Sequence, residues 1–282
     1  MKRILLAFSV LALVLSSCGE YNKVLKSTDV DYKLEKAIEY FDDGRCYQSI
    51  PIFEELIGLT RGTQKAEDVY YYHARAHYCV EDYYLANYYL SNFTKTFSYS
   101  ERAEECQFLA AMCSYNLSPE FSLDQTDTKL AINEMQLFLD KYPGSTLRDS
   151  CTTMIDQLNA KLERKNFEVA KLYVKTENFK SAVLVLDYAL RDYPNTKYRE
   201  EMMYMLVKSS YLLAAQSIEE KKMDRFADCV NHYLNFVAYF PESGYLREAE
   251  NYFDDSQKEI ERLKKVSNPW VALRTQKQSA QQ

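Results

Sequence analysis

The sequence predicts an all-α fold, in which about five helix-turn-helix repeats stack into a superhelix closed by a C-terminal capping helix. One motif recurs along the chain: Phe138-x3-Tyr142-Pro143, Ala189-x3-Tyr193-Pro194 and Phe236-x3-Phe240-Pro241, with Phe93-x3-Phe97-Ser98 as a copy without proline. A small residue lies seven positions before each copy: Ala86, Ala131, Ala182 and Cys229. With Ser49 as the first of the series, the small residues are 37, 45, 51 and 47 positions apart, which is the length of a helical pair with extended helices or turns.

The first two repeats differ in clarity. Repeat one is the weaker copy and is placed by the residues Ala37, Tyr40, Gly44, Cys46, Ser49, Phe53 and Leu56. In repeat two, Tyr70, Ala74 and His77 mark the buried stripe of the first helix. Tyr83 and Ala86 supply the aromatic and the small residue with which consensus tetratricopeptide (TPR) repeats begin their second helix.

The third repeat is expected to have helices over about 101–116 and 128–141. They are separated by an inserted segment, 118–125, in which Pro119 breaks the helix. The fourth repeat, with Ala170 and Phe179, and the fifth, with Phe226 and Phe236, follow the same scheme. A last helix over about 245–266 is predicted to cap the stack.

These elements give a domain organisation in five parts. They are a lipoprotein signal peptide (1–17), a lipidated tether (18–30), N-terminal repeats one to three (31–142), C-terminal repeats four and five with the capping helix (143–266), and a disordered tail (267–282).

The N-terminus predicts export and lipidation. Lys2 and Arg3 precede an apolar run, Ile4 to Leu15, that is too short to span a bilayer comfortably. It ends in Leu15-Ser16-Ser17-Cys18-Gly19, which matches a bacterial lipobox with Cys18 as the lipidated residue. An ordinary secretory signal with an incidental cysteine is the alternative. Several acyl chains on Cys18 would anchor the chain stably, and the absence of Asp after Cys18 favours the outer membrane.

Composition narrows the partners. Without residues 1–17 the chain loses two positive charges, which leaves 33 basic and 41 acidic residues, or −8, so nucleic acid is an unfavourable partner. The 25 tyrosines suit both helix packing and protein-binding surfaces. The six glycines form no phosphate-binding loop, which excludes nucleotide binding of that kind.

Cysteine and histidine patterns predict structural roles. No C-x-x-C pair occurs, and Cys46, Cys106, Cys113 and Cys229 fall where a repeat needs a small apolar residue, so we expect buried thiols, although the periplasm would permit disulfides. His73 and His77 have the i, i+4 spacing of a metal site, but the Glu of a zincin motif is absent and both lie on the buried stripe. Core packing is therefore favoured, with no metal, cofactor or catalytic residues, and the protein is not expected to be an enzyme.

One stripe on the first helix of repeat two is the candidate binding site. Asp68, Tyr71, Arg75 and Tyr78 follow one another at spacings of three and four, apart from the buried stripe. We interpret them as an aromatic peptide-binding groove in which Arg75 pairs with a carboxylate. The alternative is that these residues only cover repeat one.

The ordered set of features resembles one family. The lipobox, five TPR-like repeats, the turns such as Tyr142-Pro143-Gly144-Ser145, and the segment from Pro241 to Ala249 are similar to the BamD family, the lipoprotein subunit of the β-barrel assembly machine. The resemblance covers nearly all of residues 18–266, and the inserted segment resembles the Bacteroidetes type. It implies a role in folding and inserting outer-membrane β-barrel proteins, at the periplasmic face of the outer membrane.

The resemblance also implies partners. C-terminal repeats of the family dock on a POTRA domain of BamA, and its N-terminal repeats are thought to receive the C-terminal signal of unfolded barrel proteins. Lys180 and Arg191 are only regional candidates for the first contact. Two other classes stay open: a TPR lipoprotein scaffold of another envelope complex, and a SusD-like nutrient-binding lipoprotein, which would be much longer and would expose a tryptophan platform.

Overall fold

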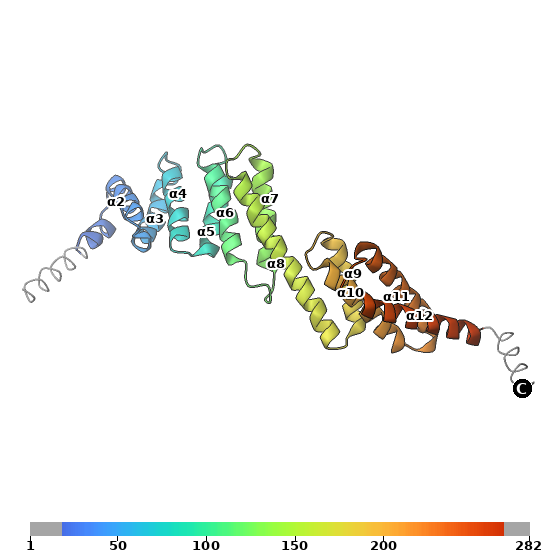
Figure 1. Cartoon of the computed structure of the whole chain (residues 1–282). Coiled ribbons are helices and arrows are strands. Elements are labelled where there is room, and N and C mark those ends of the chain that lie inside the picture. Colours follow the sequence, from blue (N-terminus) through green and yellow to red (C-terminus); the bar gives the residue numbers. More distant parts are fainter. Residues whose placement is uncertain (1–18, 268–282) are drawn as a thin grey trace, which may run out of the picture. The chain divides into compact units, whose positions relative to one another are not determined.

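The computed structural model describes residues 19–267, and within them it confirms the predicted all-α class, with no strand. A helical segment, 19–25, precedes the labelled helices (Figure 1). Those helices are α2 Val30–Asp42, α3 Cys46–Thr60, α4 Ala66–Cys79, α5 Tyr83–Thr96, α6 Ala103–Leu117, α7 Thr126–Lys141, α8 Arg148–Lys175, α9 Phe179–Asp192, α10 Arg199–Ala215, α11 Glu219–Tyr239 and α12 Leu246–Ser267. None of the helices in the described part is long and apolar enough to cross a membrane.

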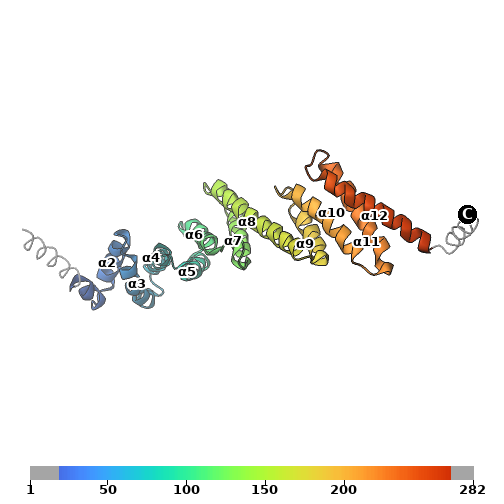
Figure 2. The same cartoon turned by 60° about the horizontal axis from the view of Figure 1, so that its bottom comes forward.

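The chain forms two compact units that meet between Asn159 and Ala160, inside α8. Within each unit the helices pack against their neighbours in chain order, as both views of the first unit show for α2 to α7 (Figures 1 and 2). Alternate helices also touch: α2 with α4, α4 with α6, and α10 with α12. Such contacts between the first helices of successive pairs are the packing of a helical solenoid. The unit boundary lies beyond the division that we placed between residues 142 and 143.

The turn inside a repeat has the same hydrogen bonds in repeats one, two and four. At the end of α4, the amides of Val80, Glu81 and Asp82 donate to carbonyls four, three and five positions earlier, and the ends of α2 and α8 have the same pattern. This is a Schellman motif, whose central residue needs a positive φ. The central residues are Gly44 (φ 74°), Glu81 (φ 61°) and Glu177 (φ 56°).

Glycine at the second of these turns should stabilise the first unit. A left-handed conformation costs a residue with a Cβ about 1–2 kcal/mol, and glycine has no such cost but loses more chain entropy on folding. We therefore expect Glu81→Gly to raise the free energy of unfolding by about 0.5–1 kcal/mol, measured by chemical denaturation. Glu81→Ala keeps the Cβ and is the matched control; an equal gain in both variants would contradict the backbone explanation.

The turn between repeats is also repeated, and it explains the aromatic-proline motif. In each of five turns, the carbonyl of the last helical or capping residue accepts a hydrogen bond from the amide of the residue three positions later. The carbonyl of that residue in turn accepts a hydrogen bond from the amide three positions further along. These ladders run over 60–63–66, 97–100–103, 142–145–148, 193–196–199 and 240–243–246. Proline fits directly after the aromatic residue because no bond of the ladder uses that amide. Ser98 therefore replaces proline at the turn of Phe97 without changing the ladder.

The predicted small residues lie where the two helices of a pair approach each other. Ser49, Ala86, Ala131, Ala182 and Cys229 are all 0% exposed. Seven positions later the core position is filled by Leu56, Phe93, Phe138, Ala189 and Phe236, which are 0–3% exposed. The five-repeat register inferred from the sequence is thus confirmed in the described helices.

The inserted segment of repeat three is closed on itself by a buried glutamine. The side chain of Gln125 donates to the carbonyls of Glu120, Leu123 and Asp124, and accepts a hydrogen bond from the hydroxyl of Thr128. These bonds satisfy backbone carbonyls that lie outside any helix. The segment separates α6 from α7 close to the predicted positions.

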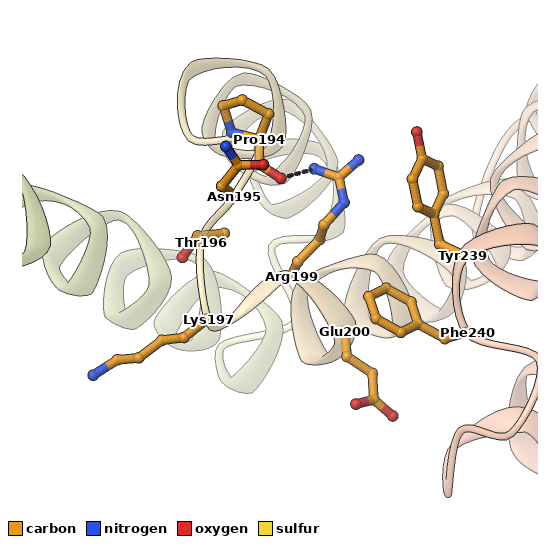
Figure 3. Close-up of a pocket in the computed structure, with 8 residues that line it drawn as sticks. All are labelled: Pro194, Asn195, Thr196, Lys197, Arg199, Glu200, Tyr239 and Phe240. Atoms are coloured by element: carbon orange, nitrogen blue, oxygen red, sulfur yellow. Dashed lines mark hydrogen bonds between the residues drawn. The ribbon is translucent and has the colours of Figure 1, made fainter.

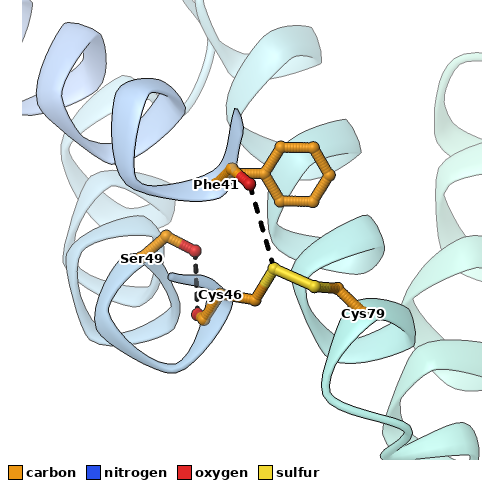
Figure 4. Close-up of a disulfide and its surroundings, with 4 residues drawn as sticks. All are labelled: Phe41, Cys46, Ser49 and Cys79. Carbon is orange, nitrogen blue, oxygen red and sulfur yellow. Dashed lines mark hydrogen bonds between the residues drawn. A yellow bond between two sulfur atoms is a disulfide. The ribbon is translucent and has the colours of Figure 1, made fainter. Parts of the chain in front are cut away.

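The cysteine prediction is wrong at one position. Cys106, Cys113, Cys151 and Cys229 are free and buried, as expected for thiols that fill small apolar sites. Cys46 is instead joined to Cys79 by a disulfide, which links the start of α3 to the end of α4 (Figure 4). Because α3 and α4 pack antiparallel, these two ends lie side by side, with the Cα atoms 6.3 Å apart.

The residues predicted as a tether include a packed helical segment. Residues 19–25 are helical, and Val24 is fully buried in the core formed with Leu34, Ala37 and Tyr40. Tyr21 and Leu25 pack against the same core. The first repeat therefore has a third helical element that covers its outer side.

Candidate peptide-binding face of the first unit

Helix α4 lies between its chain neighbours α3 and α5 and also contacts α2 and α6. Of the four residues predicted as a binding stripe, Tyr71 is buried, with 6% of its surface exposed. Asp68, Arg75 and Tyr78 are half-buried. The stripe is thus a partly covered seam between first helices rather than a free surface.

Tyr71 and Arg75 form a network with α6. The Tyr71 hydroxyl donates to Glu105 at 2.8 Å, Arg75 donates to the Tyr71 oxygen at 2.7 Å, and the Arg75 guanidinium lies 3.0 Å from the Glu105 carboxylate. Burial raises the pKa of the Tyr71 hydroxyl, which keeps it protonated as a donor. Arg75 is therefore paired with a carboxylate of this chain, that of Glu105, where we expected the carboxylate of a bound peptide.

Asp68 is engaged in the same way. It accepts from Arg102, which precedes α6, at 2.6 Å. The Arg102 guanidinium also lies over the Tyr71 ring, 4.4 Å from its centroid. Two guanidinium groups, those of Arg75 and Arg102, therefore approach one tyrosine, and each is about one-third exposed.

Tyr78 closes the end of the stripe. Its ring meets that of Tyr83 edge to face, with centroids 5.7 Å apart, and burial raises the pKa of its hydroxyl. On the other side, Arg75 lies 5.5 Å from the centroid of the Phe41 ring in α2. The structure thus brings all four predicted residues to one seam that touches repeats one and three.

The partners from α6 were missed from the sequence, although a signal for them exists. Asp68 to Arg102 and Tyr71 to Glu105 are both separated by 34 residues, which is the ideal length of one TPR repeat. Residues one repeat apart lie at equivalent positions on neighbouring first helices, where opposite charges attract. A search for complementary residues at that offset would have found both pairs.

The second unit has a surface pocket of its own, with a volume of about 570 Å³ (Figure 3). Its centre is Arg199, which donates to the carbonyl of Pro194 at 2.7 Å and lies over the Tyr239 ring, 4.6 Å from the centroid. A smaller pocket beside it shares Glu200, Tyr239 and Phe240. Both are formed where the inter-repeat turns of α9–α10 and α11–α12 lie next to each other.

Other predicted site residues lie outside these features. Lys180 and Arg191 are exposed, and Arg191 lies over the ring of Tyr188 at 5.1 Å. Neither lines the pockets of the second unit. Cys18 falls outside the residues that the structure describes.

Comparison with known proteins points to one family. A family profile described as YfiO, outer membrane lipoprotein, matches residues 30–225. The outer membrane protein assembly factor BamD of Rickettsia prowazekii (strain Madrid E) is 26% identical over 115 residues, which are 41% of this chain and 45% of that protein. The match therefore spans a little under half the length of that curated relative.

Solved structures that resemble the chain are helical repeat proteins. They include a TPR protein (BF2334) from Bacteroides fragilis NCTC 9343, with a TM-score of 0.38, 13% identity, and coverage of 83% of this chain and 100% of that chain. The TPR2AB domain of yeast Sti1 gives a TM-score of 0.37 at 11% identity, covering 84% and 94% of the two chains. The TPR domain of P58(IPK) gives 0.39 at 12% identity, covering 88% and 69%.

Proposed function

This chain belongs to the YfiO family of outer membrane lipoproteins, and on that premise we propose that it is a non-enzymatic scaffold of the β-barrel assembly machine. In this role it helps to fold and insert outer-membrane β-barrel proteins. The observation that carries the proposal is the family match over residues 30–225, which reaches from α2 into α11. The name of the Rickettsia relative, an assembly factor, supports it further.

We assign one proposed partner to each of the two units. A BamA-like barrel protein is held through a POTRA domain by the second unit, whose pocket around Arg199 and Tyr239 offers an exposed aromatic and charged edge. Unfolded barrel proteins are received by the first unit at the Asp68, Tyr71, Arg75 and Tyr78 stripe. Its two partly exposed guanidinium groups suit a C-terminal carboxylate that follows an aromatic residue. No cofactor or nucleic acid takes part.

A pull-down from the native membrane tests the proposal. Tagged protein is isolated in mild detergent from its own outer membranes, and the proteins that co-purify are identified by mass spectrometry. A BamA-like barrel protein with POTRA domains in stoichiometric amount is the expected result. A different complex without such a barrel would contradict the assembly role and leave only a TPR lipoprotein scaffold.

The membrane anchor gives a separate prediction. Cys18→Ala removes the acyl chains that would hold the mature chain at the outer membrane. We expect the variant to leave the outer-membrane fraction and to appear as a soluble or inner-membrane form in cell fractionation. Cys229→Ala, which changes a buried thiol, should fractionate like the wild type. A Cys18→Ala chain found wholly in the outer membrane would show that Cys18 is not the anchor.

The role of the Asp68, Tyr71, Arg75 and Tyr78 stripe in substrate binding is tested by the double variant Tyr71→Phe and Arg75→Gln. The pair removes one hydrogen-bonding hydroxyl and one charge, and a charge-assisted hydrogen bond contributes about 1.5–3 kcal/mol. Affinity for a peptide with the C-terminal sequence of a barrel protein should therefore fall about tenfold or more, measured by calorimetry. Arg191→Gln in the second unit is the matched control, and circular dichroism checks folding. Unchanged affinity would place the receptor site elsewhere.

A further inference from the structure

The first unit brings two imidazole groups and a carboxylate together at a place that the proposed function does not use. His73 and His77 on α4 are 1% and 4% exposed, and their Nε2 atoms are 3.3 Å apart. Glu54, on the exposed side of α3, completes the group, and the three potential ligand atoms lie within 4.8 Å of one another. The sequence indicates only the two histidines as possible ligands, because nothing in it places Glu54 beside them.

The distance between the two nitrogens is that of a metal site. Zinc binds histidine nitrogen at about 2.0–2.1 Å, and two ligands of a tetrahedral ion at that length are about 3.3–3.4 Å apart. The Nε2 atoms of His73 and His77, which share a hydrogen bond in the absence of an ion, already have this separation. An ion between them requires only that the Glu54 carboxylate, which is exposed and free to change its rotamer, closes in from α3.

The nitrogen of His77 that would not bind the ion lies near a carboxylate. Nδ1 of His77 is buried without a hydrogen bond, and the Asp82 carboxylate lies 3.8 Å from it. A metal on Nε2 fixes the tautomer with the proton on Nδ1, and that proton then faces Asp82. A carboxylate behind a ligating imidazole is the usual outer contact of metal-bound histidine. The Tyr89 ring lies against both imidazoles, with 4.4 and 5.1 Å between centroids.

We propose that Glu54, His73 and His77 bind one divalent transition-metal ion, with zinc as the ion that the geometry fits best. Two imidazoles and one carboxylate suit zinc, copper or nickel rather than calcium or magnesium, which prefer oxygen ligands. The fourth position is left to water. The ion links α3 to α4, the same two helices that the Cys46–Cys79 disulfide joins, so it stabilises the fold of the first unit rather than supplying chemistry.

The test is a titration of the full chain with Zn²⁺. The protein is purified in detergent without reductant, stripped with a chelator, and titrated by isothermal calorimetry. We expect one saturable site in the wild type. Glu54→Gln should weaken Zn²⁺ binding about tenfold or more, and His77→Gln should abolish it. The controls are His232→Gln, which changes the histidine of the second unit, and Glu242→Gln, which changes an exposed carboxylate there; both should bind Zn²⁺ like the wild type.

A second set of measurements distinguishes the loss of a metal ligand from misfolding of the variant. Glu54 is exposed, so its substitution should leave the circular dichroism spectrum unchanged. Zn²⁺ should raise the melting temperature of the wild type but not that of His77→Gln, since an ion that binds only the folded chain stabilises it. Absence of saturable binding by the wild type, or equal affinity in the wild type and Glu54→Gln, would overturn the proposal.

Discussion

Replacing Phe236 with alanine is expected to lower the free energy of unfolding of the second unit by about 3–5 kcal/mol. Phe236 lies on α11 with no exposed surface, inside the core that also contains Leu186, Val207 and Cys229. Removing its ring loses the transfer free energy of the ring and leaves a cavity, because a packed core relaxes only partly. Denaturation by guanidinium, followed by circular dichroism and analysed for two transitions, measures the loss.

Leu234→Ala on the same helix is the matched control. Leu234 is 53% exposed, so its truncation should change stability by no more than about 0.5 kcal/mol. Repeat four shows that alanine can occupy the position of Phe236, since Ala189 lies there and is 3% exposed. Ala189 is part of a core that also contains Phe167, Leu186 and Met202. Equal small losses in both variants would mean that the core around Phe236 collapses freely, contrary to the expectation.

The repeat register could be predicted because its determinants are local. A turn that ends at an aromatic residue, with proline directly after it, is visible in a few residues, and so is a small residue at a fixed distance before it. These two features located four of the five inter-repeat turns, including the one at Phe97, which has no proline. The turn after Thr60 has neither the aromatic residue nor the proline. Gly44 is of the residue type that favours a left-handed turn, but Glu81 and Glu177 have the same conformation without that residue type.

The candidate site was only half predicted, because its remaining half comes from another repeat. Spacing along α4 correctly grouped Tyr71 with Arg75, yet Glu105 and Arg102, which satisfy their charges and ring contacts, belong to the next repeat. Contacts between repeats depend on which residues of neighbouring helices face each other, and the sequence of one helix does not determine this. The sequence did not reveal Glu54 as a third possible ligand for the same reason, since its approach to His73 depends on how α3 packs on α4.

The N-terminal segment shows the limit of assigning a tether by position. Tyr21, Val24 and Leu25 have the i, i+3, i+4 spacing of an amphipathic helix, and all three pack on the first repeat. The length of chain that is free to act as a tether is therefore shorter than the 18–30 range suggested.

Breaking the Cys46–Cys79 disulfide is the second change with a large expected effect, a loss of about 3 kcal/mol in the free energy of unfolding of the first unit. The bridge joins residues 33 positions apart and lowers the conformational entropy of the unfolded chain. The reduced chain keeps that entropy when it unfolds, so its folded state is less stable. It also holds the end of α4 against the start of α3, so reduction should loosen the helix that carries the Arg75 stripe. Denaturation curves with and without a phosphine reductant measure the difference.

The variant with both cysteines changed to alanine separates the bridge from other effects of the reductant. Its stability should match that of the reduced wild type, and reductant should not change it further, because the four remaining described thiols form no bridge. The pairing also depends on the compartment: disulfides persist in the periplasm and are reduced in the cytosol. Protein made in a reducing cytosol should therefore unfold at a lower denaturant concentration than exported protein. After oxidation its unfolding midpoint should rise to that of the exported protein. Identical unfolding midpoints for the two preparations would show that Cys46 and Cys79 contribute only as buried side chains.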